Sequence, residues 1–227
     1  MIRKIISQII KIMGESLVEP QTQQHAAPGP IQMPTKDELD AALQQMMPKK
    51  EPELRTIGMF GDVTEDKVSE IIHVLVYLNE CNKLLPVDKQ LPTEFYLSTY
   101  GGSADDMFAL YDVMKQIRKE TEIHTFGLGK VMSAGVLLLA SGTKGKRRIG
   151  KNCRVMIHSV IAGNHGPLHN LVNEMEAIQQ LQEIYIDCLV EETNMTKEQL
   201  KDMLAKKVNI YLTAEEAVKL GIADIIV

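Results

Sequence analysis

From residue 54 onward, apolar positions alternate between the spacing of strands and the spacing of helices. Short apolar runs at residues 54–60, 94–98 and 123–127 have the length and composition of buried strands. Between the first two runs, apolar residues recur at helical spacing, at Val68, Ile71, Ile72, Leu75 and Leu78. Thr64 and Ser103 are of the residue types that begin helices. Strands and helices that alternate with short links predict a parallel sheet with right-handed crossovers.

The stretch from Gly127 to His158 contains a helix without a polar face. Residues 136–140 are apolar all round, which predicts a fully buried helix that begins at a small-residue turn holding Ser133. A basic turn follows at residues 144–148, and a short apolar strand then ends in His158. The pattern therefore places a serine at the start of a buried helix and a histidine at the end of a strand.

Beyond this stretch, the pattern predicts a long helix, two shorter helices and a short strand. The long helix spans about residues 167–192, and Thr196 begins the next helix. The strand is the N-I-Y-L segment, after which Thr213 and Glu216 form a capping box for the last helix. This last helix is expected to stop at Gly221, because glycine commonly terminates helices.

Residues 1–53 have a different pattern, and we expect them to form an extension outside the folded domain of residues 54–227. Residues 1–14 have the spacing of a basic amphipathic helix. Such a helix could dock on a partner or on its own oligomer, lie on a membrane surface, or act as a targeting or pro-segment. Residues 15–53 are rich in Pro and Gln, which predicts a linker, with one short helix beginning at Thr35.

Composition and charge exclude several classes of function. A chain of 227 residues with 44% hydrophobic residues suits one sizeable globular domain. The net charge of −5, the absence of Trp and the 4% aromatic content argue against a nucleic-acid surface. Cys81, Cys153 and Cys188 are widely spaced and odd in number, which favours a reducing, cytoplasmic compartment. No apolar run reaches membrane-spanning length, so no transmembrane segment is expected.

Ser133 and His158 are the candidates for covalent chemistry. A serine hydroxyl becomes a strong nucleophile when a base takes its proton, and a histidine can serve as that base. A helix N-terminus also offers backbone N–H groups to a developing oxyanion. The alternative is that Ser133 only caps its helix and His158 is structural. We expect no metal site, because His165 and His169 are separated by Pro167 and no Cys or carboxylate completes a ligand set.

The residues around this pair resemble a known family. The segments S-A-G-V-L-L-L-A-S-G-T-K-G-K-R and R-V-M-I-H, and the interval between serine and histidine, are similar to those of ClpP, the proteolytic subunit of Clp proteases. The resemblance extends from about Leu54 to the C-terminus. It implies an α/β fold of the ClpP/crotonase type, a spiral of βαβ units in which the long helix protrudes as a handle.

The resemblance also implies roles for individual residues. Ser133 corresponds to the nucleophile and His158 to its general base. The backbone N–H groups of Gly102 and Ala134 correspond to the oxyanion hole, for which glycine allows a close approach of the backbone. Gly163, in the loop after His158, resembles a glycine-bearing strand that pairs with substrate as an added β-strand.

Two departures from the family pattern affect this site. The family has a Ser-Pro-Gly-Gly turn where this chain has Thr-Tyr-Gly-Gly at residues 99–102, so the glycines are kept. The family's catalytic aspartate aligns with Asn209, and Asp202, on a predicted helix, is a weaker candidate. An asparagine can accept the imidazole N–H but cannot stabilise an imidazolium by charge. We therefore expect low activity or dependence on a neighbouring subunit.

The function implied by the resemblance is that of a serine endopeptidase without a cofactor. Family members form homo-oligomers of two stacked seven-membered rings around a closed chamber, and an AAA+ unfoldase feeds polypeptides into it. One alternative is a weakly active or non-catalytic ring subunit, which Asn209 favours. Another is an acyl-CoA enzyme of the crotonase type, which shares the spiral fold but uses acid/base carboxylates and needs no Ser/His pair.

Overall fold

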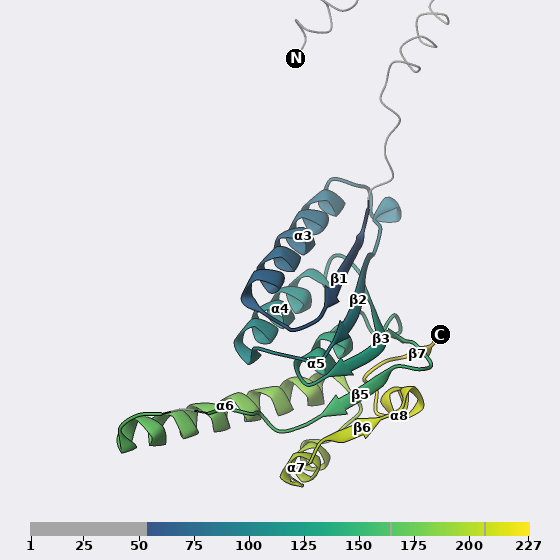
Figure 1. Ribbon diagram of the computed structural model, residues 1–227. Coiled ribbons are helices and arrows are strands. Elements are labelled where there is room, and N and C mark those ends of the chain that lie inside the picture. The colour runs from purple at the N-terminus through teal and green to yellow at the C-terminus, as the bar shows by residue number, and fades with distance from the viewer. Residues whose placement is uncertain (1–53, 164, 207) are drawn as a thin grey trace, which may run out of the picture. The chain divides into compact units, whose positions relative to one another are not determined.

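The computed structural model describes residues 54–163, 165–206 and 208–227, and the helices predicted before residue 54 lie outside these ranges. The described residues form an α/β domain around a seven-stranded, largely parallel sheet (Figure 1). Together with a long helix near the C-terminal end, this arrangement confirms the predicted fold class of the ClpP/crotonase type.

The first half of the domain follows the predicted alternation of strands and helices. Its elements are β1 (Thr56–Phe60), α3 (Glu65–Lys83), η1 (Val87–Lys89), β2 (Thr93–Thr99), α4 (Ala104–Ile117) and β3 (Ile123–Met132). The three strands lie side by side in chain order with parallel pairing. Ser103 caps α4 by accepting a hydrogen bond from the amide of Asp106, whereas Thr64 occupies the cap position of α3 without such a bond.

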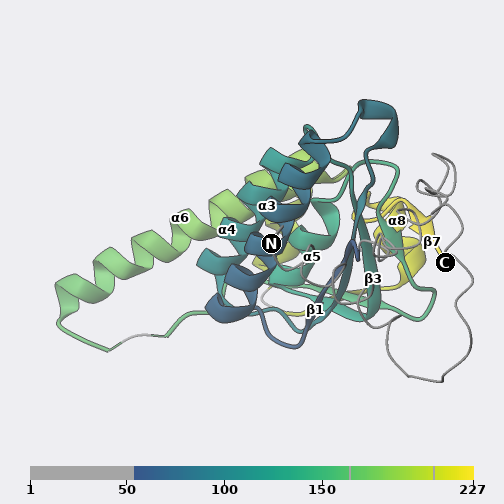
Figure 2. The same ribbon diagram turned by 90° about the horizontal axis from the view of Figure 1, so that it is seen from above.

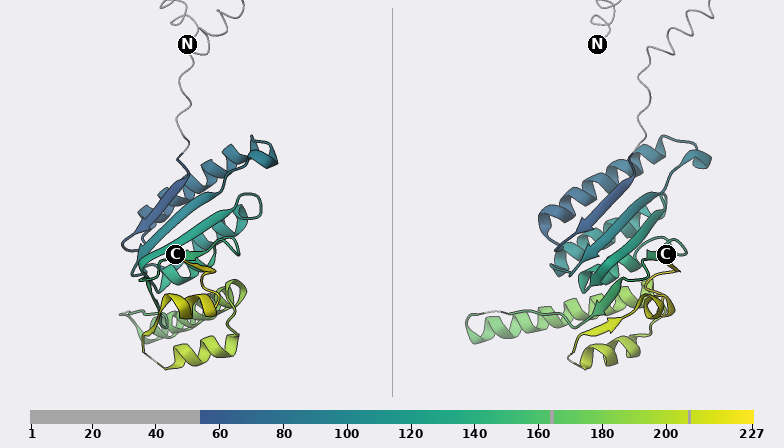
Figure 3. Two further views of the ribbon diagram at one scale, coloured as in Figure 1. Left: turned by 90° about the vertical axis from the view of Figure 1, so that its right-hand side faces the viewer. Right: turned by 45° about the vertical axis from the view of Figure 1, so that its right-hand side comes forward.

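Helices cover one face of this sheet, and the burial pattern of the strands shows which face it is. Along β2, buried and half-buried residues alternate, and Phe95 and Leu97 on the buried side are fully enclosed. A period of two is what a strand requires when only one of its faces packs on a core. The two views of Figure 3 show the N-terminal strands, coloured blue to teal, beside one another with helices behind them.

Strand β3 is longer than predicted, and its two halves pair with different strands. The middle of β3 pairs with β4 (Arg148–Ile149), through Phe126 and Gly127. Its last residues, Lys130 to Met132, pair with β5 (Arg154–Ile157). The turn predicted at residues 144–148 therefore leads into a very short strand before β5. Because β5 continues beside the end of β3, the residues that follow these two strands leave the sheet next to each other.

The remaining elements are α5 (Ala134–Ala140), α6 (Leu168–Glu192), α7 (Lys197–Ala205), β6 (Ile210–Leu212), α8 (Ala214–Lys219) and β7 (Ile225–Ile226). Every residue of α5 is buried, as its uninterrupted apolar sequence predicts. The predicted capping box of α8 is present, and Thr196, the predicted cap of α7, forms a capping box with Gln199. Strand β6 pairs with β5 in the antiparallel sense, so the sheet is not purely parallel.

Helix α6 is buried only towards its C-terminal end. Its buried residues are Tyr185, Ile186, Leu189 and Glu192, and Figure 2 shows the rest of the helix extending away from the sheet. The buried carboxylate of Glu192 accepts hydrogen bonds from Tyr111 and Arg118. Burial raises the pKa of Glu192, but the hydrogen bond and charge of Arg118 outweigh it and hold the pKa below its ordinary value. The helix therefore projects as a handle from a firmly fixed base.

Candidate active site

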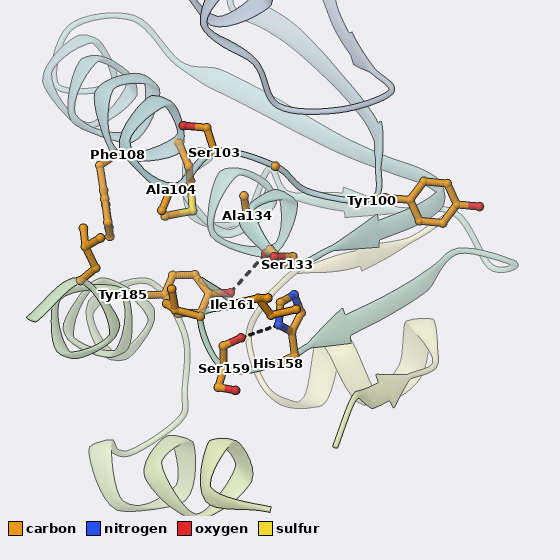
Figure 4. Close-up of a pocket in the computed structure, with 14 residues that line it drawn as sticks. Tyr100, Ser103, Ala104, Phe108, Ser133, Ala134, His158, Ser159, Ile161 and Tyr185 are labelled. Carbon is orange, nitrogen blue, oxygen red and sulfur yellow. Dashed lines mark hydrogen bonds between the residues drawn. The ribbon is translucent and has the colours of Figure 1, made fainter. Parts of the chain in front are cut away.

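A pocket lies where β3 and β5 end. Ser133 and His158, two of the three predicted catalytic residues, line it. Ser133 and Ala134 come from the turn between β3 and α5, Gly102 from the turn after β2, and His158 from the end of β5 (Figure 4). Its other lining residues include apolar side chains of α4 and α6, namely Met107, Phe108, Leu181 and Tyr185. The fold thus brings together the Ser, the His and both predicted oxyanion-hole residues.

The backbone of Ser133 is held in an unusual conformation. Its φ of 54° makes it the one non-glycine residue with a positive φ in the described part of the chain. Its N–H donates to the carbonyl oxygen of Met156 at 2.8 Å, and its own carbonyl accepts from the amide of Val136 at 2.9 Å. Such a conformation costs about 1–3 kcal/mol and persists where the surroundings determine it, typically at functional sites.

Gly101 allows the backbone to pass close to this serine. A Cβ built on Gly101 would lie 2.5 Å from the Ser133 Cβ and 3.0 Å from its Oγ. Only a residue without a side chain can occupy this position without displacing the serine. The glycines that the sequence keeps in this turn are therefore required by packing against the candidate nucleophile.

The two predicted oxyanion donors are free to bind a ligand. Gly102 and Ala134 both line the pocket, and neither amide donates a hydrogen bond to another described residue. Ala134 is buried, where a backbone N–H is rarely left without a partner, whereas Gly102 is exposed. Two unused N–H groups beside a serine hydroxyl are the arrangement that a tetrahedral oxyanion requires.

His158 is held by a neighbouring backbone carbonyl. Its Nδ1 is hydrogen-bonded to the carbonyl oxygen of Ser159, and because a carbonyl can only accept, Nδ1 is the donor. In the neutral imidazole the other nitrogen, Nε2, then carries a free lone pair, as a general base requires. No hydrogen bond joins Ser133 Oγ to His158 within the described residues, although both side chains line the same pocket.

Asn209 lies beside the histidine in the strand register but is not bonded to it. The antiparallel pairing of β5 with β6 ends at Ile157 and Ile210, so His158 and Asn209 are each one residue beyond the same pair. Asn209 is exposed, and no hydrogen bond links it to His158 among the described residues. Asp202 is exposed on α7 and does not line the pocket. The role of Asn209 as third catalytic residue stays a prediction.

Gly163 lies apart from these residues. It is exposed in the loop between β5 and α6, and it is not among the residues that line the pocket. A Cβ added there would meet no atom within 4 Å, so its surroundings do not require a glycine. Its predicted contact with substrate therefore stays a prediction.

The apolar wall of the pocket contains residues that the sequence reasoning missed. Leu181 and Tyr185 lie one helical turn apart on α6 and both line the pocket. Figure 4 shows Tyr185 and Phe108 on the same side of it. The Tyr185 hydroxyl donates to the carbonyl oxygen of Ser133 at 3.2 Å. Burial raises the pKa of this tyrosine far above its ordinary value. Their spacing was a visible signal of a helix face, but nothing in it indicated contact with Ser133.

Two further findings concern metals and membranes. Among the residues that the structure describes, no group of three or more His, Cys, Asp or Glu side chains could hold a metal ion. Within the same residues, no helix is both long enough and apolar enough to cross a bilayer.

The fold defines the ClpP/crotonase class of α/β proteins, and comparison with known sequences identifies the family within that class. A family model described as Clp protease matches residues 44–227. The chain therefore belongs to the ClpP family of serine peptidases. The match begins before Leu54, so it is somewhat longer than the resemblance seen in the sequence alone.

Individual relatives support this assignment. The ATP-dependent Clp protease proteolytic subunit 1 of Corynebacterium glutamicum is 32% identical over 174 residues, covering 76% of this chain and 78% of that protein. The subunit 1 of Prochlorococcus marinus subsp. pastoris is 30% identical over 172 residues, covering 76% and 83%. The proteolytic subunit of Borreliella afzelii is 29% identical over 170 residues, covering 75% and 81%.

Proposed function

We propose that this protein is a serine endopeptidase of the ClpP type. The observation that carries the proposal is one pocket lined by Ser133, His158 and two unused backbone N–H groups. The family assignment supports it independently, because the relatives are named as proteolytic subunits of ATP-dependent proteases. Neither argument depends on Asn209.

The proposed mechanism uses the pair as nucleophile and base. His158 Nε2 removes the proton from Ser133 Oγ while Oγ attacks the peptide carbonyl carbon. The amides of Gly102 and Ala134 bind the oxygen that becomes negative. The protonated histidine then gives its proton to the leaving amine, and water hydrolyses the acyl-enzyme in a second cycle. In the active arrangement, we propose that the amide oxygen of Asn209 accepts the hydrogen bond from His158 Nδ1–H, in place of the Ser159 carbonyl.

The remaining parts of the proposal concern the assembly. We propose polypeptide substrates that lie along Gly163, and a homo-oligomer of stacked rings fed by an AAA+ unfoldase in the cytoplasm. The basis is that the relatives are named as subunits of an ATP-dependent protease. We also propose that residues 1–53 are an extension joined to a peptidase domain of residues 54–227. No cofactor is required for any step.

A weakly active or non-catalytic ring subunit is the second candidate. The exposed position of Asn209, and the lack of a hydrogen bond between it and His158, favour this candidate. A crotonase-type acyl-CoA enzyme has less support, because it needs acid/base carboxylates. No Asp or Glu is among the residues described as lining this pocket.

Labelling with a fluorophosphonate, together with a peptidase assay of the purified assembly, tests the proposal. We expect the wild-type protein to be labelled and to cleave peptides, and Ser133→Ala to lose both with its assembly intact. The matched control is Ser103→Ala, which removes another hydroxyl from the same pocket at a cost of about 1 kcal/mol in helix capping. Absence of labelling in the wild-type assembly would instead support the non-catalytic subunit.

A further inference from the structure

The hydroxyl of Tyr185 forms a contact with the candidate nucleophile that the catalytic mechanism above does not use. It donates to the carbonyl oxygen of Ser133 at 3.2 Å, and Figure 4 shows this contact as a dashed line. Tyr185 itself is only 6% exposed and sits in α6, far from Ser133 in the sequence. A buried hydroxyl usually has a hydrogen-bond partner. The partner here is the carbonyl oxygen of Ser133, the non-glycine residue with a positive φ in the described part of the chain.

The peptide unit between Ser133 and Ala134 connects this contact to the oxyanion hole. A peptide bond is planar and trans, so the carbonyl of one residue and the N–H of the next are fixed in opposite directions. Whatever orients the Ser133 carbonyl therefore also orients the Ala134 N–H. Ala134 lines the pocket, and its N–H has no hydrogen-bond partner among the described residues.

Within this peptide unit, the Ser133 carbonyl has two partners of different origin. One is the amide of Val136, which belongs to the same short turn and moves with it. The other is the hydroxyl of Tyr185, which belongs to α6 and therefore holds the carbonyl from outside the turn. A strained residue such as Ser133 is stable only when its surroundings over-determine it, and an external hydrogen bond contributes to that.

We propose that Tyr185 is a positioning residue that fixes the Ser133–Ala134 peptide plane and thereby aims the Ala134 N–H at the substrate's oxyanion. The proposal rests on the proposed function and adds one residue to those assigned a role in it. Tyr185 does not act as an acid or base, because its hydroxyl proton is already donated to the Ser133 carbonyl. Its effect on the reaction is indirect, through the direction of one peptide plane.

The location of Tyr185 in α6 links its contact with Ser133 to the packing of this helix on the domain. Tyr185 is the first buried residue of this helix counted from its exposed N-terminal end, and the Glu192 network fixes the helix further on. The hydroxyl therefore reaches Ser133 from the point where α6 enters the domain. The orientation of the oxyanion donor is tied to the seating of this helix.

The test compares two buried tyrosine hydroxyls. Tyr185→Phe removes the hydroxyl that contacts Ser133 and keeps the ring in the pocket. Tyr111→Phe is the matched control, because its hydroxyl is also buried and donates to Glu192 on the same helix at 3.1 Å. Both variants lose one hydrogen bond and are expected to melt a few degrees lower, since such a bond stabilises a fold modestly.

The two variants should differ in the reaction. We expect Tyr185→Phe to lower both kcat for a peptide and the fluorophosphonate labelling rate of Ser133 about tenfold, which corresponds to about 1.4 kcal/mol. KM should change less than about twofold, because an interaction made in the transition state affects kcat. The pH profile should not shift, since His158 is untouched. Tyr111→Phe should leave all of these kinetic values at the wild-type level, because Arg118 still binds Glu192 and keeps α6 in place.

A crystal structure of Tyr185→Phe gives a readout that does not depend on activity. We expect the Ser133–Ala134 peptide plane to rotate or to become disordered. A variant that keeps the φ of Ser133 and the direction of the Ala134 N–H would overturn the positioning role, as would wild-type kcat and labelling rates. If the wild-type protein is neither labelled nor active, the proposed function fails, and the crystal structure alone then decides whether Tyr185 orients the peptide plane.

Discussion

The two halves of the candidate site are held by the fold to very different degrees. Ser133 is tied through its N–H to Met156, through its carbonyl to Tyr185, and sterically by Gly101. His158, by contrast, has one recorded hydrogen bond, to the carbonyl of the next residue in the chain. The neighbouring Asn209 is exposed and unbonded to it in the described structure.

This difference shows which part of the chemistry is built into a single chain. The candidate nucleophile Ser133 and the candidate oxyanion donor Ala134 lie at the strained β3–α5 turn, and the second candidate donor, Gly102, lies in the turn after β2. The candidate base, His158, is the first residue after β5, where the chain leaves the sheet and fewer contacts restrict it. We infer that the nucleophile half depends on the packing of one domain. The base half includes Asn209, whose role as third catalytic residue stays a prediction.

The largest effect is expected from Gly102→Ala, which breaks the nucleophile half. A Cβ at this position would lie 2.2 Å from the carbonyl oxygen of Val63, which is backbone and cannot rotate away. The turn must shift and carry the Gly102 amide with it. We expect peptide cleavage to fall at least about a hundredfold, since losing one oxyanion donor typically costs that much. Steady-state kinetics with a fluorogenic peptide measures it.

Gly145→Ala is the control for backbone strain. Gly145 also has a positive φ, of 81°, but a Cβ there would meet nothing within 4 Å. It should lose roughly 1–2 kcal/mol of stability and keep its activity. If Gly102→Ala were as active as Gly145→Ala, the turn would not be a fixed part of the site, and the contrast between the two halves would disappear.

A smaller effect is expected in the base half, at Asn209. Asn209→Asp keeps the shape of the side chain and adds a negative charge that favours an imidazolium. We expect it to keep or raise activity by up to a few-fold, with the gain limited by the desolvation of a charge. Asn209→Ala should lower activity. The measurement is kcat/KM for a peptide across pH.

Asp202→Ala is the comparison for this series, and it should have little effect because Asp202 is exposed on α7 outside the pocket. A loss of activity in Asp202→Ala, with none in Asn209→Ala, would mean that the third residue is wrongly assigned. Equal activity in every one of these variants would indicate that the Ser159 carbonyl alone orients His158.

The smallest effect is expected from removing residues 1–50. Both halves of the site lie between Gly101 and Asn209, so their geometry should not change. We expect the shortened protein to fold, assemble and label at Ser133 at the wild-type rate. Analytical ultracentrifugation and labelling measure this. An insoluble or monomeric product would show instead that the N-terminal region belongs to the assembly.

Sequence reasoning predicted the fold well wherever one local rule was sufficient. Apolar runs located β1, β2 and α5, and the cap at Thr196 and the capping box at Thr213 located the last helices. The family resemblance then brought Ser133 and His158 to one pocket. These predictions succeeded because period, caps and motif spacing are properties of contiguous residues.

Other features could not be read from the sequence because they depend on contacts between distant segments. The Tyr185–Ser133 hydrogen bond joins residues of two helical regions, and no spacing rule connects them. The sequence did not predict the short strand β4, whose first residue, Arg148, is the last residue of the predicted turn, because its two residues pair only with β3 and β7. The orientation of the His158 ring depends on which nearby oxygen its Nδ1 reaches.

The double pairing of β3 has a consequence for how the chain can change in length. Gly127 pairs with β4 and Met132 with β5. The number of residues between these two pairings therefore fixes where Ser133 lies relative to both strands. Adding or deleting one residue here would turn each following side chain to the opposite face of the sheet. The serine would then point away from its histidine. A change by an even number keeps the faces, and β3 carries such an irregularity here: it advances from Gly127 to Val131 while β2 advances only from Leu97 to Thr99.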